Sequence, residues 1–152
     1  MDMKIRKVVI RVYGIWINDE NQILLSDEYY NGAFFTKFPG GGLELGESVY
    51  ECLKREWKEE LAVEIEILRH FYTSEFFQQS AFDHSAQILS IYYLVRPTTE
   101  VKVSISMIKQ EEQIIRQARQ TFRWMKGAEL RESHVTFPID RKVATMLLET
   151  LL

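Results

Sequence analysis

GGGLELGESVYECLKREWKEELAV, residues 40–63, decides the fold and the chemistry predicted for this chain. Its three leading glycines can adopt backbone angles closed to other residues, so the chain can pass close to a ligand or an ion there. Gly46, Glu47 and Ser48 then form a plausible turn into a helix, and no residue breaks that helix from Glu47 to Leu61. The stretch therefore predicts a glycine loop followed by a helix.

The predicted helix has an apolar side and an opposite, solvated side. At about 100° per residue, the apolar arc contains Val49, Tyr50, Leu53, Trp57 and Leu61, whereas the opposite face contains Glu51, Lys54 and Lys58. Three other carboxylates lie together on an arc that borders and partly overlaps the apolar one: Glu56, Glu59 and Glu60. Burial and mutual repulsion disfavour three negative charges at that place, so a positive group is expected beside them.

The nearest positive group in the sequence is Arg55, which precedes Glu59 by one helical turn. A single guanidinium cannot neutralise three carboxylates, whereas hard divalent cations are bound by oxygen clusters of this kind. The glycine loop and the acidic helix together therefore predict a metal-dependent phosphate site. The chain has neither the lysine of a P-loop nor a dinucleotide fingerprint.

This segment is similar to the signature of the Nudix hydrolase family, G-x5-E-x7-R-E-U-x-E-E-x-G-U, where U is a bulky aliphatic residue. The matching residues are Gly41, Glu47, Arg55, Glu56, Glu59, Glu60 and Val63. Trp57 replaces the usual aliphatic residue, and we expect it to enlarge the packed volume. Ala62 replaces the closing glycine, which predicts that the helix ends in a turn that needs no positive φ.

The resemblance implies an α/β (α+β) fold of the Nudix type, an α/β/α sandwich with a mixed sheet between helices. It implies hydrolysis of a nucleoside diphosphate linked to another group, by attack of water on phosphorus with Mg²⁺ or Mn²⁺ holding the pyrophosphate. On that pattern Glu59 and Glu60 are metal ligands, Glu56 is a ligand and a possible activator of water, and the Gly40 carbonyl completes the metal shell.

Two supporting roles follow from the same resemblance. Arg55 would orient Glu59, and Glu47 would hold the loop or an outer-shell water. The general base in the family varies between this segment and a later loop, where Glu111 and Glu112 are the candidates here. A nearby carboxylate suffices as the base, because metal ions lower the pKa of bound water.

The substrate and two other functions stay open at this point. Gln78, Gln79 and Ser80 occupy the region where some relatives carry a proline or tyrosine that indicates the substrate, so a nucleotide sugar, ADP-ribose and an oxidised nucleoside triphosphate all remain. A non-catalytic nucleotide-sensing module would be favoured by loss of any of the three clustered glutamates. An isomerase of the isoprenoid type would need a catalytic cysteine outside the helix.

Composition predicts a single domain over residues 1–152, since 46% of the chain is hydrophobic. The one cysteine, Cys52, lies near the apolar side of the helix, which favours a buried thiol in a reducing compartment. Arg11 interrupts the amino-terminal apolar run, so we expect no membrane span and a cytoplasmic protein. A net charge of -3 argues against nucleic-acid binding, and the expected partner is a small nucleoside diphosphate derivative, with a homodimer plausible.

Alternation and turn residues predict the remaining elements. The expected strands are residues 7–17, 22–26, 34–38, 63–77, 85–95 and 122–125, with a polar loop over 27–32 and a helix over 139–152. Residues 107–121 receive no role. Asp83 and His84 are interpreted as a surface turn, His70 and His134 have no evident partner, and the aromatic residues at 29, 30, 34 and 35 are interpreted as core more readily than as a stacking surface.

Overall fold

The computed structural model describes residues 4–111, 114 and 119–151, and the chain divides into two compact units. The first unit comprises Met1–Gly14 and Gly40–Val101, and the second comprises Ile15–Pro39 and Lys102–Leu152. The single domain over residues 1–152 stays a prediction.

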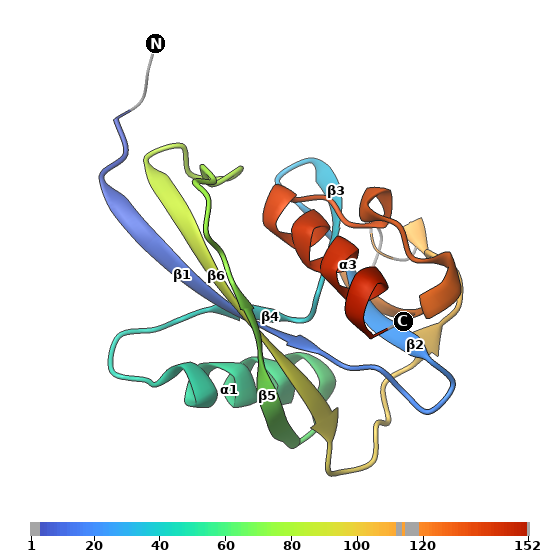
Figure 1. Cartoon of the computed structure of the whole chain (residues 1–152). Coiled ribbons are helices and arrows are strands. Elements are labelled where there is room, and N and C mark those ends of the chain that lie inside the picture. Colours follow the sequence, from blue (N-terminus) through green and yellow to red (C-terminus); the bar gives the residue numbers. More distant parts are fainter. Residues whose placement is uncertain (1–3, 112–113, 115–118, 152) are drawn as a thin grey trace. The chain divides into compact units, whose positions relative to one another are not determined.

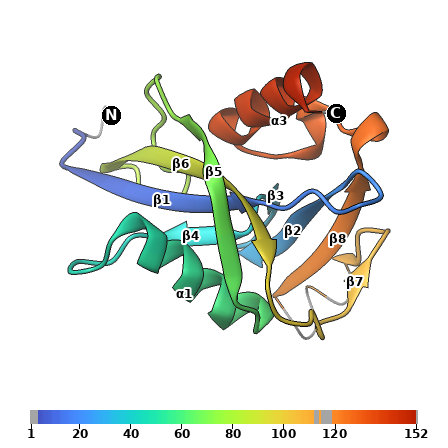
Figure 2. The ribbon, with the colours of Figure 1, turned by 60° about the horizontal axis from the view of Figure 1, so that its bottom comes forward.

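The first unit is built on a four-stranded sheet with the strand order β4-β1-β6-β5 (Figures 1 and 2). Its elements are β1 (Lys7–Ile15), β4 (Gly40–Gly42), α1 (Val49–Leu61), β5 (Ile65–Thr73) and β6 (Ala86–Pro97). The glycine run is itself a strand, because Gly40, Gly41 and Gly42 pair antiparallel with Tyr13, Val12 and Arg11 of β1. Helix α1 packs against β4 and β5, so the sheet holds the glycine strand beside the acidic helix.

Helix α1 begins at a side-chain cap and buries most of the predicted apolar side, whereas Val49 is half-buried and Tyr50 is exposed. Ser48 is the N-cap, and its hydroxyl accepts a hydrogen bond from the Glu51 backbone N–H at 3.1 Å. The buried residues of the helix are Cys52, Leu53, Trp57 and Leu61. The residues predicted on its solvated face, Glu51, Lys54 and Lys58, are all exposed. The helical pattern of the sequence is confirmed.

The prediction for the end of α1 was wrong. Ala62 adopts the left-handed conformation, with φ 56° and ψ 34°, and its N–H donates to the Lys58 carbonyl at 3.0 Å. The helix therefore ends in a cap that glycine would adopt without strain, because the Cβ of alanine crowds the backbone in this conformation.

Ala62→Gly is expected to stabilise the protein by about 1 kcal/mol, because it removes left-handed strain at an exposed position. The gain should raise the melting temperature by about 2–4 °C in thermal unfolding. Ala62→Val is the matched variant, and it should lower the melting temperature, since a β-branched residue fits this conformation worse. Equal melting temperatures for all three proteins would contradict the assigned cap.

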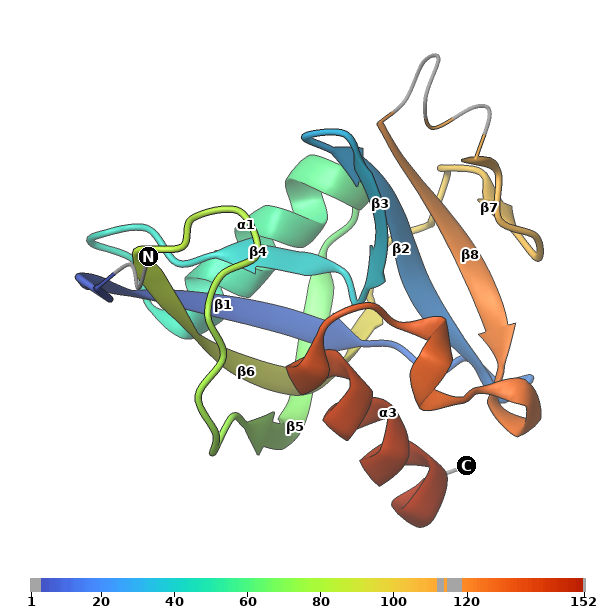
Figure 3. The ribbon, with the colours of Figure 1, turned by 90° about the horizontal axis from the view of Figure 1, so that it is seen from above.

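The second unit is built on another four-stranded sheet with the order β3-β2-β8-β7 (Figure 3). Its elements are β2 (Gln22–Tyr30), β3 (Ala33–Lys37), β7 (Ile105–Ser106), β8 (Gln120–Lys126), the 3-10 turns η2 (Gly127–Glu129) and η3 (Glu132–His134), and α3 (Pro138–Thr150). The sheet is mixed, because β7 is parallel to β8 while the β2 pairings are antiparallel. The rings of Phe35 in β3 and Phe137 before α3 lie 5.4 Å apart.

The prediction of a polar loop over residues 27–32 was wrong. Strand β2 continues to Tyr30, and Asn31 and Gly32, with φ 53° and 80°, make the two-residue turn into β3. Positive φ at both central residues is the geometry of a type I′ turn, for which Asn-Gly is the strongest short sequence signal. The polar residues of this stretch belong to a strand because their partners lie on β3 and β8.

The predicted α+β class, with mixed sheets and two helices, is confirmed, and the strands are divided between two sheets. Strand β5 ends at Thr73 instead of residue 77, β8 is longer than the predicted 122–125, and α3 starts at Pro138. The short β7 was not predicted. Within the described ranges, no helix combines the length and the apolar character that crossing a bilayer requires.

Candidate functional site

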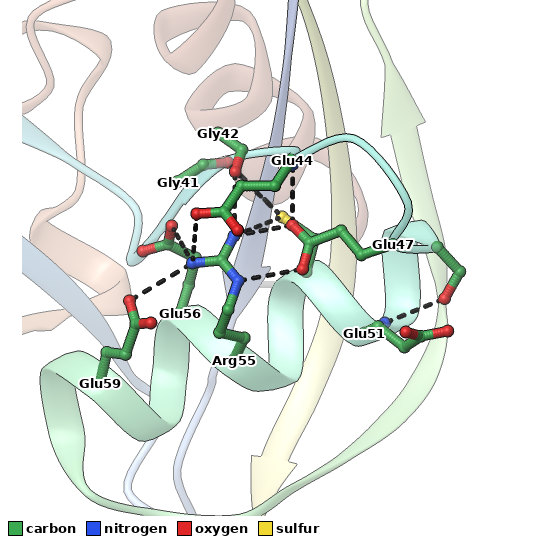
Figure 4. Close-up of polar contacts among 10 residues, drawn as sticks. Gly41, Gly42, Glu44, Glu47, Glu51, Arg55, Glu56 and Glu59 are labelled. Carbon is green, nitrogen blue, oxygen red and sulfur yellow. Dashed lines mark hydrogen bonds and ion pairs between the residues drawn. The ribbon is translucent and has the colours of Figure 1, made fainter.

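Arg55 lies at the centre of a network that joins α1 to the glycine strand and its following loop (Figure 4). Its Nε and Nη2 donate to the two carboxylate oxygens of Glu47 at 2.9 and 2.7 Å. Its Nη1 donates to Glu56 Oε1 at 3.0 Å and to Glu59 Oε2 at 3.3 Å. Nη2 also donates to the Gly42 carbonyl at 3.1 Å. One guanidinium therefore binds three carboxylates and the backbone of β4. The sequence predicted only that Arg55 orients Glu59.

Glu47 closes the loop between β4 and α1. Its Oε1 accepts from the Glu44 backbone N–H at 2.8 Å, and its own N–H donates to the Glu44 carbonyl at 3.3 Å. Gly46 lies at the third position of this four-residue turn with φ 88°, a conformation that type II turns reserve for glycine. The hydrogen bonds from Arg55, and then that from Glu44, lower the pKa of Glu47 to about 2, so the group stays ionised at neutral pH.

The backbone of Gly41 lies directly against the carboxylate of Glu56. A Cβ at Gly41 would overlap the carboxyl carbon and both oxygens of Glu56, and a Cβ at Gly40 would overlap the carbonyl oxygen of Val12. At Gly42 the nearest atom to such a Cβ is 3.8 Å away, on Arg11. Gly40 and Gly41 must therefore be glycine, because neighbouring atoms leave no room for a Cβ. Gly41 in this way sets the position of Glu56, a predicted site carboxylate.

Gly41→Ala is expected to lower turnover by roughly tenfold to a hundredfold, because the added methyl forces the Glu56 carboxylate to move by about 1 Å or more. Turnover and thermal unfolding measured on the same preparation check this. Gly42→Ala is the matched control and should stay near wild type, since there is room for its Cβ and the carbonyl that accepts from Arg55 is kept. Similar activity in both variants would contradict the role of the Gly41 contact.

The three predicted metal ligands of α1 differ in exposure. The Glu56 side chain is 15% exposed and that of Glu59 is 60% exposed, while the Oε2 atom of Glu60 is buried. In the part of the chain that the structure describes, no three acidic, histidine or cysteine side chains converge into a ready metal site. The donor set still fits a hard divalent cation, because it consists of carboxylate oxygens and one of them lies in a cradle that a Cβ would fill.

Sequence reasoning missed two neighbours of Arg55. The carboxylate of Glu44 lies 3.8 Å from Nη1, and Nη2 donates weakly to the Cys52 sulfur at 3.8 Å. Sequence spacing was the available signal, because Glu44 lies three residues before Glu47 and Cys52 lies three residues before Arg55. Burial raises the pKa of Cys52 to about 12, with the charge of Glu47 adding to it, so this thiol is a poor nucleophile at neutral pH. The cysteine expected in an isoprenoid isomerase is therefore not supplied by Cys52.

Comparison with protein families matches the NUDIX domain over residues 8–146. The chain belongs to the Nudix family. Comparison with curated proteins gives no match. Among solved structures, this Nudix chain is similar to the E. coli ORF135 protein, with a TM-score of 0.68, 19% identity, and coverage of 95% of this chain and 92% of that one.

Two MutT structures resemble this Nudix chain to a similar degree. The MutT protein of Methanosarcina mazei Go1 gives a TM-score of 0.66 at 18% identity and covers 95% of this chain and 94% of its own. A MutT structure from work on Aliivibrio salmonicida and Vibrio cholerae gives 0.64 at 21% identity, with 95% and 99% covered. At these identities the similarity shows the fold.

Residues outside the acidic segment of this Nudix chain have structural partners. Asp83 forms an ion pair with Lys7 at 2.8 Å and accepts from Ser85, which agrees with a surface turn. His70 Nε2 lies 2.8 Å from Thr73 Oγ1, and His134 Nδ1 accepts from the Arg131 N–H at 3.0 Å. Both histidines thus have partners that the sequence did not reveal.

Of the two later-loop candidates for the general base, the structure describes only Glu111. The Glu111 side chain is 59% exposed and lies 3.5 Å from Lys109, whereas Glu112 lies outside the described residues. Within residues 107–121 the structure describes 107–111, 114 and 119–121. The role of this segment therefore stays open.

Proposed function

We propose that the chain is a metal-dependent Nudix hydrolase that cleaves a phosphoanhydride bond of a nucleoside diphosphate linked to another moiety. The observation that supports this most is the network of Arg55, which holds Glu47, Glu56 and Glu59 against a glycine strand of the same family segment. A non-catalytic module would not need a carboxylate fixed against backbone by close steric contact.

The proposed ligands of the divalent cation, Mg²⁺ or Mn²⁺, are Glu56, Glu59, Glu60 and the carbonyl of Gly40. When bound, such a cation neutralises charge on phosphate oxygens and lowers the pKa of bound water. Glu59 is the most exposed of the three carboxylates and its hydrogen bond to Arg55 is long, at 3.3 Å, so its side chain can reorient toward a ligand.

The residues that surround the ligands have positioning roles in this proposal. Arg55 keeps Glu56 and Glu59 on one side of α1, and Glu47 keeps Arg55 in place through two hydrogen bonds. Glu56 is our candidate for taking the proton of the attacking water, because it is the least exposed of the carboxylates that Arg55 holds on α1 and its place is fixed by Gly41. Glu111 is the alternative base.

The experiment that tests the proposal is product-resolved turnover over a panel of nucleotide sugars, ADP-ribose, dinucleoside polyphosphates and oxidised nucleoside triphosphates. Each substrate is tested with Mg²⁺, with Mn²⁺ and with chelator, beside Glu60→Gln. Metal-dependent cleavage that the variant loses is the expected result, and it names the substrate class. Binding without turnover across the panel would contradict the hydrolase and favour a nucleotide-sensing module.

We further propose that the partner is a small nucleotide rather than a nucleic acid, in line with the net charge of -3, and that the protein acts in the cytoplasm. Pairing into a homodimer stays a prediction, and sedimentation would test it.

A further inference from the structure

Two aromatic rings and two cations gather near the end of the β2–β3 hairpin in the second unit. The hairpin itself can be followed in Figure 3. We call this group the aromatic–cation cluster, and its members are Tyr29, Phe34, Lys109 and Arg119. The two rings lie 4.9 Å apart at 55°. The Arg119 guanidinium carbon lies 5.5 Å from the centre of the Tyr29 ring, and Lys109 Nζ lies 5.7 Å from that of Phe34. Each ring therefore carries a cation at cation–π distance.

Among the residues that the structure describes, Arg119 has no acidic partner. Within the described ranges no carboxylate lies within 4 Å of its guanidinium, whereas Arg55, Arg96 and Arg123 each pair with one. An aromatic face orients a guanidinium without neutralising it, and Arg119 is exposed. Lys109 is partly neutralised, because Glu111 lies 3.5 Å away. Arg119 is therefore the main positive group that the cluster presents.

The backbone of Arg119 is strained, with φ 60°. Its N–H donates to the carbonyl of the buried Ile114 at 3.0 Å, and its carbonyl accepts from the Tyr29 N–H at 3.0 Å, so the fold imposes the left-handed conformation on this residue. Glycine would adopt that conformation without strain. The arginine costs stability at this position, and such outliers point to a role of the side chain.

We propose that the aromatic–cation cluster binds the phosphate groups of pyrophosphate or of a nucleoside diphosphate, with Arg119 as the principal contact. A guanidinium offers a fork of N–H donors that matches phosphate oxygens in pairs, and the tilted ring beneath it limits its freedom before binding. Lys109 adds a second cation on the neighbouring ring. The proposed phosphate site lies within the second unit and goes beyond the proposed hydrolysis.

The test is calorimetric titration of the whole protein in chelator and low salt, so that carboxylate-bound metal does not contribute. The probes are pyrophosphate, ADP and adenosine, and the variants are Arg119→Gln, Arg119→Lys and Arg119→Gly. Arg119→Gln should weaken binding of both phosphate probes by at least about tenfold, because a charge-assisted hydrogen-bond pair is lost, while the lysine variant retains part of it. Arg96→Gln is the matched control, an exposed arginine on β6 paired with Glu66, and should bind as wild type does.

Arg119→Gly separates binding from folding. It should lose binding as the glutamine variant does, yet its melting temperature should equal or exceed that of wild type, since the strain at φ 60° is relieved. Binding of the phosphate probes by the glutamine variant at wild-type strength would overturn the proposal. Failure of wild type to bind either phosphate probe, or equal affinity for adenosine and ADP, would overturn it as well.

The outcomes also separate this inference from the proposed function. Arg119-dependent phosphate binding in a protein without turnover on any substrate would leave the cluster standing and reject the hydrolase. Turnover by wild type, together with binding of pyrophosphate by Arg119→Gln at wild-type strength, would reject the cluster and leave the hydrolase standing. If both proposals hold, wild type shows metal-dependent turnover and Arg119→Gln loses binding of pyrophosphate and ADP in chelator.

Discussion

Glu60→Gln, and separately Glu59→Gln, is expected to lower turnover by at least about a hundredfold while leaving the fold intact. Each change keeps the size of the side chain and removes the charge of a proposed metal ligand within a crowded anionic group. Turnover with Mg²⁺, the affinity for Mn²⁺ by calorimetry, and thermal unfolding together separate loss of the ligand from loss of the fold.

The same helix supplies the control for this prediction. Glu51 is exposed on the solvated face of α1, so Glu51→Gln should be nearly silent in turnover and in metal affinity. Unchanged activity in both Glu59→Gln and Glu60→Gln would remove the site assignment. Lost activity with unchanged metal affinity would move the two residues from ligand roles to positioning roles.

Arg123→Met is expected to destabilise the second unit by about 3–5 kcal/mol, because it leaves a buried carboxylate without its cation. Arg123 Nε donates to Asp27 Oδ2 at 2.6 Å, the Thr36 hydroxyl donates to Oδ1 at 2.5 Å, and Asp27 is completely buried. Urea unfolding, with a shift of the midpoint at constant slope, measures the loss.

Arg96→Met is the matched control, since the Arg96–Glu66 ion pair has the same length of 2.6 Å but lies at the surface, where such pairs contribute about 1 kcal/mol or less. The double variant Asp27→Asn with Arg123→Met should recover much of the loss, because the buried charge is then gone. A cost for Arg123→Met no larger than that for Arg96→Met would contradict the buried pair.

The acidic helix could be predicted from the sequence because its signals are local. The period of its apolar residues, the cap at Ser48 and the spacing of Glu56, Glu59 and Glu60 all lie within one element. The hydrogen bonds from Arg55 to Glu47 were not predicted, because they depend on how the loop after β4 folds back over α1. Helical spacing alone reveals only the Arg55–Glu59 pair, at 3.3 Å.

The β2–β3 hairpin was missed because its stabilising contacts are distant in sequence. Asp27 and Glu28 look like loop residues until Arg123 and Lys37 are known to pair with them. The Asn31-Gly32 pair was a usable signal for a hairpin turn, but the polar composition of residues 27–32 led to the prediction of a loop. The left-handed Ala62 could not be read from residue identity, because the surrounding contacts impose a conformation that alanine itself disfavours.

The partners of Arg55 also bear on how the chain folds. The farthest group that it binds, the Gly42 carbonyl, is 13 positions away, whereas the Asp27–Arg123 pair closes a loop of 96. Closing the longer loop costs about 2 kcal/mol more chain entropy. The strand-to-helix segment that carries the acidic residues is thus a low-contact-order module, and we expect it to assemble early in folding, with the proposed metal ligands of α1 in place ahead of the charged pair that stabilises the other sheet.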